Sequence, residues 1–338
     1  MSHQVTIQPS GHHFSMEEDE SVLSAALREG FNLPYGCRNG ACGSCKGRLL
    51  EGHVTHSGSA TGLTDADREA GKILFCVAHP TSDISIECRE IGAARDIQIR
   101  TLPCRVHRLE RLADDVMRIF LKLPSNERLQ FLPGQYIDIL LKDGQRRSFS
   151  IANAPHDDAL VELHVREVPQ GMFTSHVFHG MKEKDILRIE GPLGDFWLRE
   201  DSDRPLLFIA GGTGFAPIQA MISHALHHRQ TRPMTLYWGA RARKDLYLAD
   251  TPARWAAEHE HLRWTPVLSQ PADADQWEGR RGLVTDAVAQ DHPDLSGFDV
   301  YVCGAPAMVD AARRMCQQRN LPDDAFFADA FSFQGATA

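Results

Sequence analysis

Four cysteines constrain the fold of this 338-residue chain more than any other feature of its sequence. Cys37, Cys42 and Cys45 follow C-x4-C-x2-C spacing in a loop rich in small residues, and Cys76 lies further along the chain. Thiolates at this spacing, with a distant fourth cysteine, are typical ligands of the two irons in a [2Fe–2S] cluster. The sequence therefore predicts that a cluster-binding loop organises the first part of the chain.

Two other roles for these cysteines fit the sequence less well. A disulfide framework needs an oxidising compartment, whereas residues 1–6 lack the basic flank and apolar stretch of a secretion signal. A zinc site usually pairs two short cysteine units, and Cys76 has no close cysteine partner in the sequence. We therefore expect a reducing, cytoplasmic location. The loop glycines Gly36, Gly40 and Gly43 would allow left-handed turns and bring amide N–H groups to the cluster sulfides.

Length and charge narrow the class of protein further. A chain of 338 residues is too long for one ordinary core, so two or three domains are expected. No apolar run reaches the roughly 18 residues of a membrane span. The net charge of −9 argues against a nucleic-acid partner. The acidic run at residues 17–20 is either a solvated face or a patch that steers an electron-transfer partner.

Three stretches of the chain differ in periodicity. Residues 1–92 predict alternating strands around the cluster loop and a helix that begins after Ser21 as N-cap. Residues 100–203 contain regular short strands separated by turns, which is typical of a closed antiparallel barrel. Residues 204–338 alternate between buried strands and amphipathic helices, which predicts a parallel sheet covered on both faces. The predicted fold class is therefore multidomain: α+β, then β, then α/β.

A glycine-rich turn, residues 211–217, directly follows the first buried strand of the last stretch. Pro217 stands where the third glycine of a dinucleotide fingerprint would be, and it suits the first turn of a helix. Free amides and the helix dipole would make this turn an anion site suited to a pyrophosphate. A plain tight turn is the alternative, and the flanking strand and helix disfavour it.

Two short motifs in the middle stretch combine hydroxyl groups with a phosphate-binding pattern. In residues 147–150, Arg-Ser-Phe-Ser, the arginine can contact a phosphate with two N–H groups, and the hydroxyls and ring can bind and cover a flavin. Residues 171–175, Gly-Met-Phe-Thr-Ser, form a second small loop with amides available for phosphate. Taken singly, each motif could be an ordinary exposed edge.

The order of these motifs, followed by Cys-Gly-Ala-Pro at residues 303–306, resembles the ferredoxin–NADP reductase superfamily with an N-terminal plant-type [2Fe–2S] ferredoxin domain. Residues 147–153, 161–166, 189–194, 211–217 and 327–331 are similar to CDP-6-deoxy-3,4-glucoseen reductases. The likeness covers nearly the whole chain. It implies a ferredoxin-like β-grasp domain, an FAD-binding β-barrel and an NAD(P)-binding domain, together forming an NAD(P)H-dependent oxidoreductase.

The resemblance also implies roles for single residues, with Ser150 and Cys303 as the catalytic pair, near flavin N5 and the nicotinamide. FAD would be held by Arg147, Ser148, Phe149, Ser150, Gly171, Met172 and Thr174. NAD(P)H would be held by Gly211, Gly212, Thr213, Gly214, Pro217, Arg241, Cys303 and Gly304. Phe149 replaces the usual tyrosine, which keeps ring stacking but loses a phenol hydrogen bond. Phe331 would shield the flavin. The alternative for Cys303 is a structural role as a buried strand cysteine. The alternative for Phe331 is a place in the hydrophobic core.

The preferred nicotinamide nucleotide stays open between NADH and NADPH. No acidic residue follows Trp238 directly at the strand end to hold a ribose diol. Arg241, Arg243 and Lys244 could accept a 2′-phosphate, which would favour NADPH, or form a solvated basic loop. The resemblance to the glucoseen reductases favours NADH.

Together these features predict an electron relay. A hydride would pass from NAD(P)H to FAD, and single electrons would then pass through the [2Fe–2S] cluster to a partner protein. The predicted partner is a CDP-4-keto-6-deoxyglucose 3-dehydrase. The alternative is an aromatic-ring or phenol-type oxygenase. A redox sensor on the same scaffold is a hypothesis of another class, and the intact nucleotide motifs argue against it.

Overall fold

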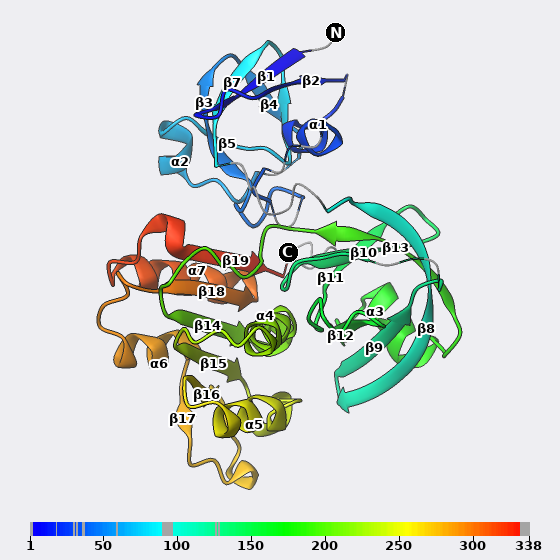
Figure 1. The fold of residues 1–338 in the computed structure, drawn as a ribbon, viewed down its shortest axis with the longest axis vertical. Coiled ribbons are helices and arrows are strands. Elements are labelled where there is room, and N and C mark those ends of the chain that lie inside the picture. The colour runs from blue at the N-terminus through cyan, green and yellow to red at the C-terminus, as the bar shows by residue number, and fades with distance from the viewer. Residues whose placement is uncertain are drawn as a thin grey trace. The chain divides into compact units, whose positions relative to one another are not determined.

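The computed structural model of this chain describes residues 3–17, 19–29, 31, 33–35, 38–58, 60–89, 97–125, 127 and 129–331. The chain divides into two compact units, Met1–Gln98 and Ile99–Ala338 (Figure 1). The first unit contains the predicted cluster loop. The second unit contains both the antiparallel and the parallel sheet, so the two predicted nucleotide-binding parts can be described together.

The first unit is a mixed sheet with a helix packed on it. Its strand order is β2-β1-β7-β3-β5, in which β1 and β7 run parallel and the other neighbours antiparallel. Helix α1 begins after Ser21, whose hydroxyl accepts the Ser24 amide at 3.2 Å, as expected of an N-cap. The elements are β1 (His3–Gln8), β2 (His13–Met16), α1 (Val22–Arg28), β3 (Lys46–Glu51), β4 (Val54–His56), α2 (Asp65–Glu69), β5 (Lys72–Leu74), β6 (Ala78–Pro80) and β7 (Ile84–Glu87).

The first half of the second unit is an antiparallel barrel. The strand order is β11-β10-β13-β8-β9-β12, and a bridge between Ile151 and Leu163 joins the two edge strands. Side chains alternate along β12: Val161, Leu163 and Val165 lie in the barrel core, so the residues between them point outward. The elements are β8 (Arg100–Ala113), β9 (Val116–Lys122), β10 (Tyr136–Leu140), β11 (Arg146–Ser150), β12 (Val161–Arg166), α3 (Met172–His179) and β13 (Ile186–Leu193).

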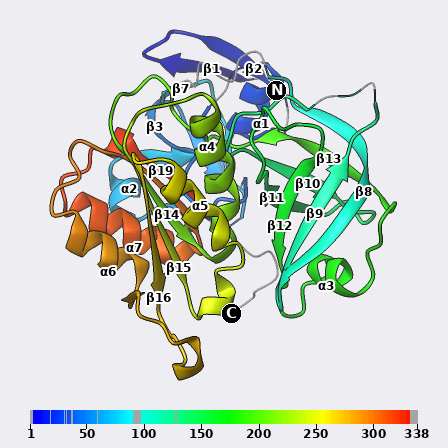
Figure 2. The same ribbon diagram turned by 60° about the horizontal axis from the view of Figure 1, so that its bottom comes forward.

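The second half of this unit is a parallel sheet with helices on both faces (Figure 2). Its strand order is β17-β16-β15-β14-β18-β19. Helices α4 and α5 pack on one face, and α6 and α7 pack on the other. The elements are β14 (Leu206–Gly211), α4 (Phe215–His227), β15 (Met234–Ala240), α5 (Asp250–Glu258), β16 (Leu262–Leu268), β17 (Arg280–Arg281), α6 (Val284–Asp291), β18 (Asp299–Gly304), α7 (Pro306–Gln317) and β19 (Phe326–Ala330).

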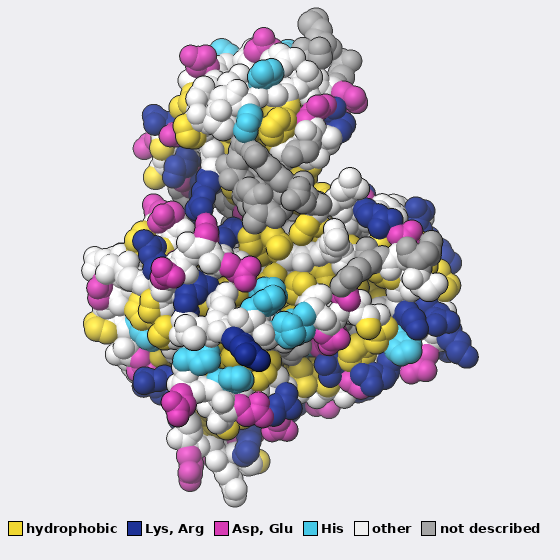
Figure 3. Space-filling model, viewed as in Figure 1, with side chains coloured by type: hydrophobic (Ala, Val, Ile, Leu, Met, Phe, Trp, Pro, Cys, Tyr) yellow, Lys and Arg dark blue, Asp and Glu magenta, His cyan; other side chains and the backbone are white. Residues whose placement is uncertain are grey.

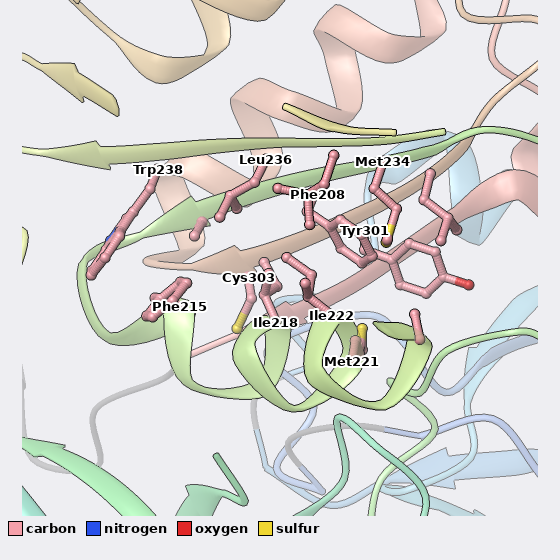
Figure 4. Packing of buried hydrophobic residues seen from close by; sticks show 14 of the residues in the cluster. Phe208, Phe215, Ile218, Met221, Ile222, Met234, Leu236, Trp238, Tyr301 and Cys303 are labelled. Carbon is pink, nitrogen blue, oxygen red and sulfur yellow. The ribbon is translucent and has the colours of Figure 1, made fainter. Parts of the chain in front are cut away.

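Aromatic packing fixes the start of α4 on the sheet (Figure 4). The Phe215 ring stacks on the Trp238 ring of β15, with 4.0 Å between centroids. Ile218, Met221 and Ile222 continue the contact along the helix, all fully buried. Burial of this apolar face holds the glycine-rich turn before α4 at the carboxyl edge of the sheet. None of the helices in the described residues has the length and hydropathy that a membrane crossing requires.

Candidate functional site

A pocket of about 200 Å³ lies at the carboxyl edge of the parallel sheet. Gly212 follows β14, Gly239 and Ala240 end β15, and Ser269 follows β16, so the ends of neighbouring strands border it. The lining residues are Arg166, Gly212, Gly239, Ala240, Arg241, Asp245, Ser269, Gly282, Leu283, Val284 and Met308. Ligands of open α/β sheets bind at this edge, which makes the pocket the candidate nucleotide site.

Glycines allow the chain segments beside this pocket to meet without side chains between them. A Cβ at Gly214 would lie 2.1 Å from the Cys303 carbonyl oxygen, and one at Gly211 would lie 2.5 Å from Met308 Sδ. Gly304 lies against Gly211, since its Cβ would be 3.2 Å from the Gly211 Cα. The main chains at the ends of β14 and β18 therefore pack against each other, and the turn at Gly212, which lines the pocket, forms a cradle in which a pyrophosphate can approach the main chain.

The glycine-rich turn is tied to the neighbouring strand. Gly212 adopts φ +54°, a left-handed conformation, and its carbonyl accepts the Trp238 indole N–H at 2.9 Å. Thr213 and Gly214 complete a short 3-10 turn, and both are buried. Pro217 is buried in the first turn of α4, where its missing N–H breaks no helical hydrogen bond. The predicted anion-binding turn is thus a largely buried strand-to-helix connection, tied to β15 by the Trp238 hydrogen bond.

Two arginines and one carboxylate set the charge of the pocket. Arg166, at the end of β12 in the barrel half, reaches the turn, because a Cβ at Gly212 would lie 3.5 Å from its guanidinium. Its Nε lies 3.5 Å from an Asp115 carboxylate oxygen, yet buried Nε and Nη2 find no hydrogen-bond partner among the described residues. Unsatisfied guanidinium donors beside the glycine-rich turn fit a pyrophosphate.

Arg241 and Asp245 line the same pocket, while the other cations of this loop are engaged elsewhere. The Arg243 guanidinium donates to the Asp275 carbonyl at 3.3 Å, and Lys244 Nζ lies 3.0 Å from an Asp114 carboxylate oxygen. The sequence pattern predicts Arg241 as a pocket residue but misses Arg166 and Asp245. For Arg166, the alternation with the core residues of β12 is the signal that could have found it.

The barrel half brings the two predicted flavin motifs together. The Phe149 ring of β11 lies 5.6 Å from the Phe173 ring of α3, centroid to centroid, so the segment with Arg147 lies beside the start of α3. Arg147 and Phe149 are half-buried and share one face of the strand, whereas Ser148 and Ser150 share the other. The Ser148 hydroxyl donates to Asp138 at 2.6 Å.

The loop at the start of α3 is closed by one threonine. The Thr174 hydroxyl accepts the Val168 amide at 3.1 Å and lies 3.1 Å from the Gly171 carbonyl oxygen. Gly171 is needed for this closure, because a Cβ there would lie 2.5 Å from Thr174 Oγ1. Met172 is an exposed hydrophobic residue at the first helical position. The amides of the first turn lack intrahelical partners, so the loop fits a phosphate through its main chain.

Cys303 lies at the end of β18 with its side chain fully buried. Its sulfur points toward α4, near Phe215 and Ile218 (Figure 4), and burial raises the pKa of the thiol well above its usual value. This burial agrees with the alternative of a buried strand cysteine, and its place near the nicotinamide stays a prediction. The Phe331 amide donates to the Gly304 carbonyl at 2.9 Å, which holds the end of β19 beside Cys303.

Three of the four predicted cluster ligands lie in the described part of the first unit, and Cys37 lies outside it. The Sγ atoms of Cys45 and Cys76 are 3.1 Å apart. The Cys45 thiol and the Gly40 amide lower the pKa of Cys76, which favours the thiolate that iron requires. Among the described residues no three ligand side chains are already closed around a metal position.

Backbone conformation and one ion pair hold this cluster loop. Arg38, Gly40 and Gly43 all have positive φ, as the predicted left-handed turns require of the two glycines. Lys46, directly after Cys45, forms an ion pair with Asp67 of α2. Thiols in contact, with a main-chain amide on one sulfur, fit an iron–sulfur cluster in donor type and in arrangement.

Histidine side chains gather over α4 in the second unit (Figure 3). The His156 ring, from a loop of the barrel half, stacks on the His227 ring of α4 with 3.7 Å between centroids. His224 lies 6.4 Å from His156 and 4.3 Å from His228, ring to ring, and Glu200 lies 3.2 Å from its Nε2. Burial is the main cause of the lowered pKa of His156, and the charges of His227 and His224 lower that pKa further. Burial also lowers the pKa of His224.

Acidification is therefore expected to destabilise the second unit. A folded-state pKa below the unfolded value of about 6.5 means that the unfolded chain binds more protons as pH falls. Stability is then greatest above that pH and declines below it, with Glu200 and Asp157 opposing the effect only in part. Between about pH 7.5 and pH 5.5, His156→Asn should lose roughly 2–4 °C less in melting temperature than wild type, because it removes one of the two histidines of this group whose pKa is lowered. The exposed His107→Asn should match wild type; equal losses in all three would contradict the effect.

Comparison with known proteins agrees with this arrangement. The chain matches the models of a 2Fe-2S iron-sulfur cluster binding domain over residues 5–81, an oxidoreductase FAD-binding domain over 103–197 and an oxidoreductase NAD-binding domain over 208–314. The fold and the site thus define an NAD(P)H-dependent oxidoreductase that uses FAD and a [2Fe–2S] cluster. The chain belongs to the ferredoxin–NADP reductase superfamily, among members with an N-terminal 2Fe-2S domain. The predicted fold class and cofactors are confirmed.

Full-length relatives serve different electron acceptors. The chain is 41% identical to CDP-6-deoxy-L-threo-D-glycero-4-hexulose-3-dehydrase reductase of Yersinia pestis, over 98% of this chain and 99% of that protein. It is 36% identical to the phenol 2-monooxygenase reductase component DmpP of Pseudomonas sp. (strain CF600), over 98% and 95%. The crystal structure of the Amycolatopsis cytochrome P450 reductase GcoB is similar with a TM-score of 0.81 and 34% identity, over 97% and 98%.

Proposed function

We propose that this protein is the reductase of a CDP-sugar 3-dehydrase, with NADH as its electron donor. Identity of 41% along the whole length of a reductase of that kind, against 36% for a phenol hydroxylase reductase, is the observation that carries the choice of acceptor. A cytoplasmic location belongs to the proposal, because thiolate ligands must stay reduced. When bound, FAD accepts the hydride and releases its two electrons one at a time, as a one-electron cluster requires.

Within the second unit, FAD and NADH would be bound by different sets of residues. Arg147, Gly171 and the amides before Thr174 would hold the FAD phosphates, with Phe149 against the ring system and Ser150 at the reacting edge. The glycine-rich turn and Arg166 would hold the NADH pyrophosphate. In the first unit, Cys37, Cys42, Cys45 and Cys76 would hold the cluster. The main chain at Gly304 and the Phe331 ring would border the nicotinamide site.

Asp245 supports NADH over NADPH. Asp245 lines the pocket, where its carboxylate would accept hydrogen bonds from the ribose diol and repel a 2′-phosphate. Of the three basic residues in this loop, Arg241 lines the pocket, whereas Arg243 and Lys244 contact Asp275 and Asp114. Within this loop, then, one pocket-lining cation, Arg241, stands beside one carboxylate, Asp245, which favours a neutral diol over a dianionic phosphate there, while Arg166 is left for the pyrophosphate.

Asp245→Asn is therefore expected to shift the preference toward NADPH. The amide keeps an oxygen that can accept the Ala242 amide at the present 3.1 Å, but it removes the charge that repels the 2′-phosphate. The ratio of kcat/KM for NADH to that for NADPH should fall by about tenfold, equivalent to roughly 1.4 kcal/mol. Steady-state reduction of an artificial acceptor measures it. Asp310→Asn, on the exposed side of α7, is the matched control, and an equal ratio in both variants would reject the role of Asp245.

The acceptor is tested with purified components. The holoprotein and NADH are combined either with a CDP-4-keto-6-deoxyglucose 3-dehydrase and its sugar nucleotide, or with an aromatic-ring or phenol oxygenase and its substrate. The proposal expects the 3-deoxy sugar product in the first mixture, detected by chromatography. Hydroxylated product from the oxygenase alone would move the protein to the alternative, which full-length oxygenase reductases of similar identity support.

A further inference from the structure

The outward face of β12 carries three polar side chains at alternate positions, Glu162, His164 and Arg166. Arg166 borders the nucleotide pocket. Glu162 and His164 are buried and contact the parallel-sheet half of the unit, although neither contributes to the pocket lining. Two buried titratable groups between the two nucleotide-binding halves need an explanation that the pocket does not supply.

Glu162 is the centre of a hydrogen-bond network that joins both halves. Arg118 of β9 donates to its two carboxylate oxygens at 2.9 Å each, and His164 Nε2 lies 2.8 Å from Oε1. From α4, the Gln219 amide donates to Oε1 at 3.1 Å and to the Ala152 carbonyl at 3.1 Å. Burial alone would raise the pKa of Glu162, but the hydrogen bonds from His164 and Arg118 hold it at about 2. Glu162 is therefore a carboxylate that accepts every one of these bonds.

His164 links Glu162 to Tyr247 through hydrogen bonds at its two ring nitrogens. Burial lowers the pKa of His164, so the ring is neutral, and its Nε2 must carry the proton to donate to the Glu162 carboxylate. Nδ1 is then an acceptor, and the Tyr247 hydroxyl donates to it at 3.0 Å. The ring of Tyr247 meets the Trp238 ring edge-on at 5.2 Å between centroids.

Trp238 completes the connection to the nucleotide turn. Its indole N–H donates to the Gly212 carbonyl, and its ring stacks on Phe215 at the start of α4. A continuous path of contacts thus runs from Glu162 of the barrel through His164, Tyr247 and Trp238 to the glycine-rich turn. Each member is joined to the next by a hydrogen bond or by ring packing.

We propose that Glu162, His164 and Tyr247 are positioning residues for hydride transfer, which set the glycine-rich turn, and with it the nicotinamide, relative to the flavin. They would act through Trp238 and α4 rather than by direct contact with either cofactor. The proposal rests on hydride delivery from NADH to FAD, and it is independent of the acceptor. A loosened path would leave NADH bound by its pyrophosphate and adenosine contacts but would make the reactive alignment rarer.

Tyr247→Phe tests this with the loss of one hydroxyl group while the ring packing stays. Tyr237→Phe is the matched control: that tyrosine is also buried, and its hydroxyl donates to Asp291 at 2.8 Å on the opposite face of the sheet. Flavin bleaching of the anaerobic holoprotein is followed by stopped flow at increasing NADH. The limiting rate of Tyr247→Phe should fall about tenfold with the apparent Kd for NADH within about twofold of wild type. Tyr237→Phe should match wild type in both.

Two further measurements separate positioning from general loosening of the fold. With NADH deuterated at the transferred hydrogen, Tyr247→Phe should keep a primary isotope effect at least as large as wild type, because hydride transfer limits the rate. Glu162→Gln should slow bleaching as well, and the double variant should be no slower than the slower single variant, since both act on one path. If Glu162→Gln fails to fold, Tyr247→Phe alone decides.

The outcomes distinguish this inference from the proposed function. Equal limiting rates in Tyr247→Phe and Tyr237→Phe overturn the positioning role, as does a change in Kd alone. Failure of the wild-type holoprotein to bleach with NADH would instead overturn the NADH-dependent relay itself.

Discussion

Replacing Gly214 with alanine is expected to slow NADH-driven flavin reduction by about 100-fold, the cost of misplacing a reacting group by roughly 1 Å. Gly214 has φ −60°, which any residue adopts, so the glycine is needed for space alone. A Cβ would lie 2.1 Å from the carbonyl oxygen of Cys303, 2.5 Å from its carbonyl carbon and 2.9 Å from the Gly304 amide nitrogen. These are main-chain atoms of a central strand, so the start of α4 must move away from β18.

The measurement is the stopped-flow rate of flavin bleaching, with a thermal melt and the FAD content recorded beside it. FAD should stay bound, because the barrel motifs are untouched, while overpacking should cost about 1–3 kcal/mol of stability. Gly297→Ala is the control, since no described atom lies within 4 Å of a Cβ there and the residue is exposed. A wild-type bleaching rate in Gly214→Ala would show that the cradle does not position the nicotinamide nucleotide.

Replacing Cys76 with alanine is expected to abolish electron delivery while leaving flavin reduction intact. Cys76 is the predicted fourth ligand, and its sulfur contacts Cys45 and the Gly40 amide, so its loss is expected to remove a ligand and a main-chain hydrogen bond to sulfur. Iron should fall from about two atoms per chain toward none. NADH-dependent reduction of cytochrome c should fall by at least about 100-fold. Substitution of a residue that only hydrogen-bonds a metal ligand already lowers metal affinity or activity by about 10–100-fold.

Flavin bleaching by NADH should stay within about twofold of wild type in the same protein, because both nucleotide-binding halves lie in the other compact unit. Cys88→Ala is the matched control: this half-buried cysteine of the first unit has no ligand spacing, and its variant should keep its iron. Full iron content in Cys76→Ala would remove Cys76 from the ligand set. Loss of bleaching along with iron would mean that the two units are not functionally separable.

The elements that periodicity and capping describe were predictable, because their signals are local. Ser21 caps α1, alternation marks the barrel strands, and the buried run at residues 205–210 marks the strand β14 before the glycine-rich turn. The superfamily was predictable too, because its motifs are short and follow a fixed order along the chain. The structure divides into compact units between residues 98 and 99, where the first and second predicted domains meet. The second and third predicted domains belong to one compact unit.

The site was less predictable where its members come from distant parts of the chain. Asp245 lines the pocket because a short 3-10 turn follows β15 and ends at this residue. In the sequence, Asp245 lies several positions beyond the strand end, so the usual pattern of an acid at the strand end did not reveal it. Arg166 lines the same pocket although it belongs to the barrel. Cys303 illustrates the reverse: the motif points to the nicotinamide, while its side chain is fully buried against α4.

By itself, the sequence determined the domain order, the cofactors and the types of strand and helix, since these depend on spacing, periodicity and turn chemistry within short windows. Tertiary structure alone decided which polar side chains meet. His164 and Tyr247 are 83 positions apart, and Gln219 and Glu162 are 57 apart, so their hydrogen bonds exist only once the barrel and the parallel sheet have packed together. Burial then gives these contacts their strength, because a buried carboxylate must be fully paired to remain charged.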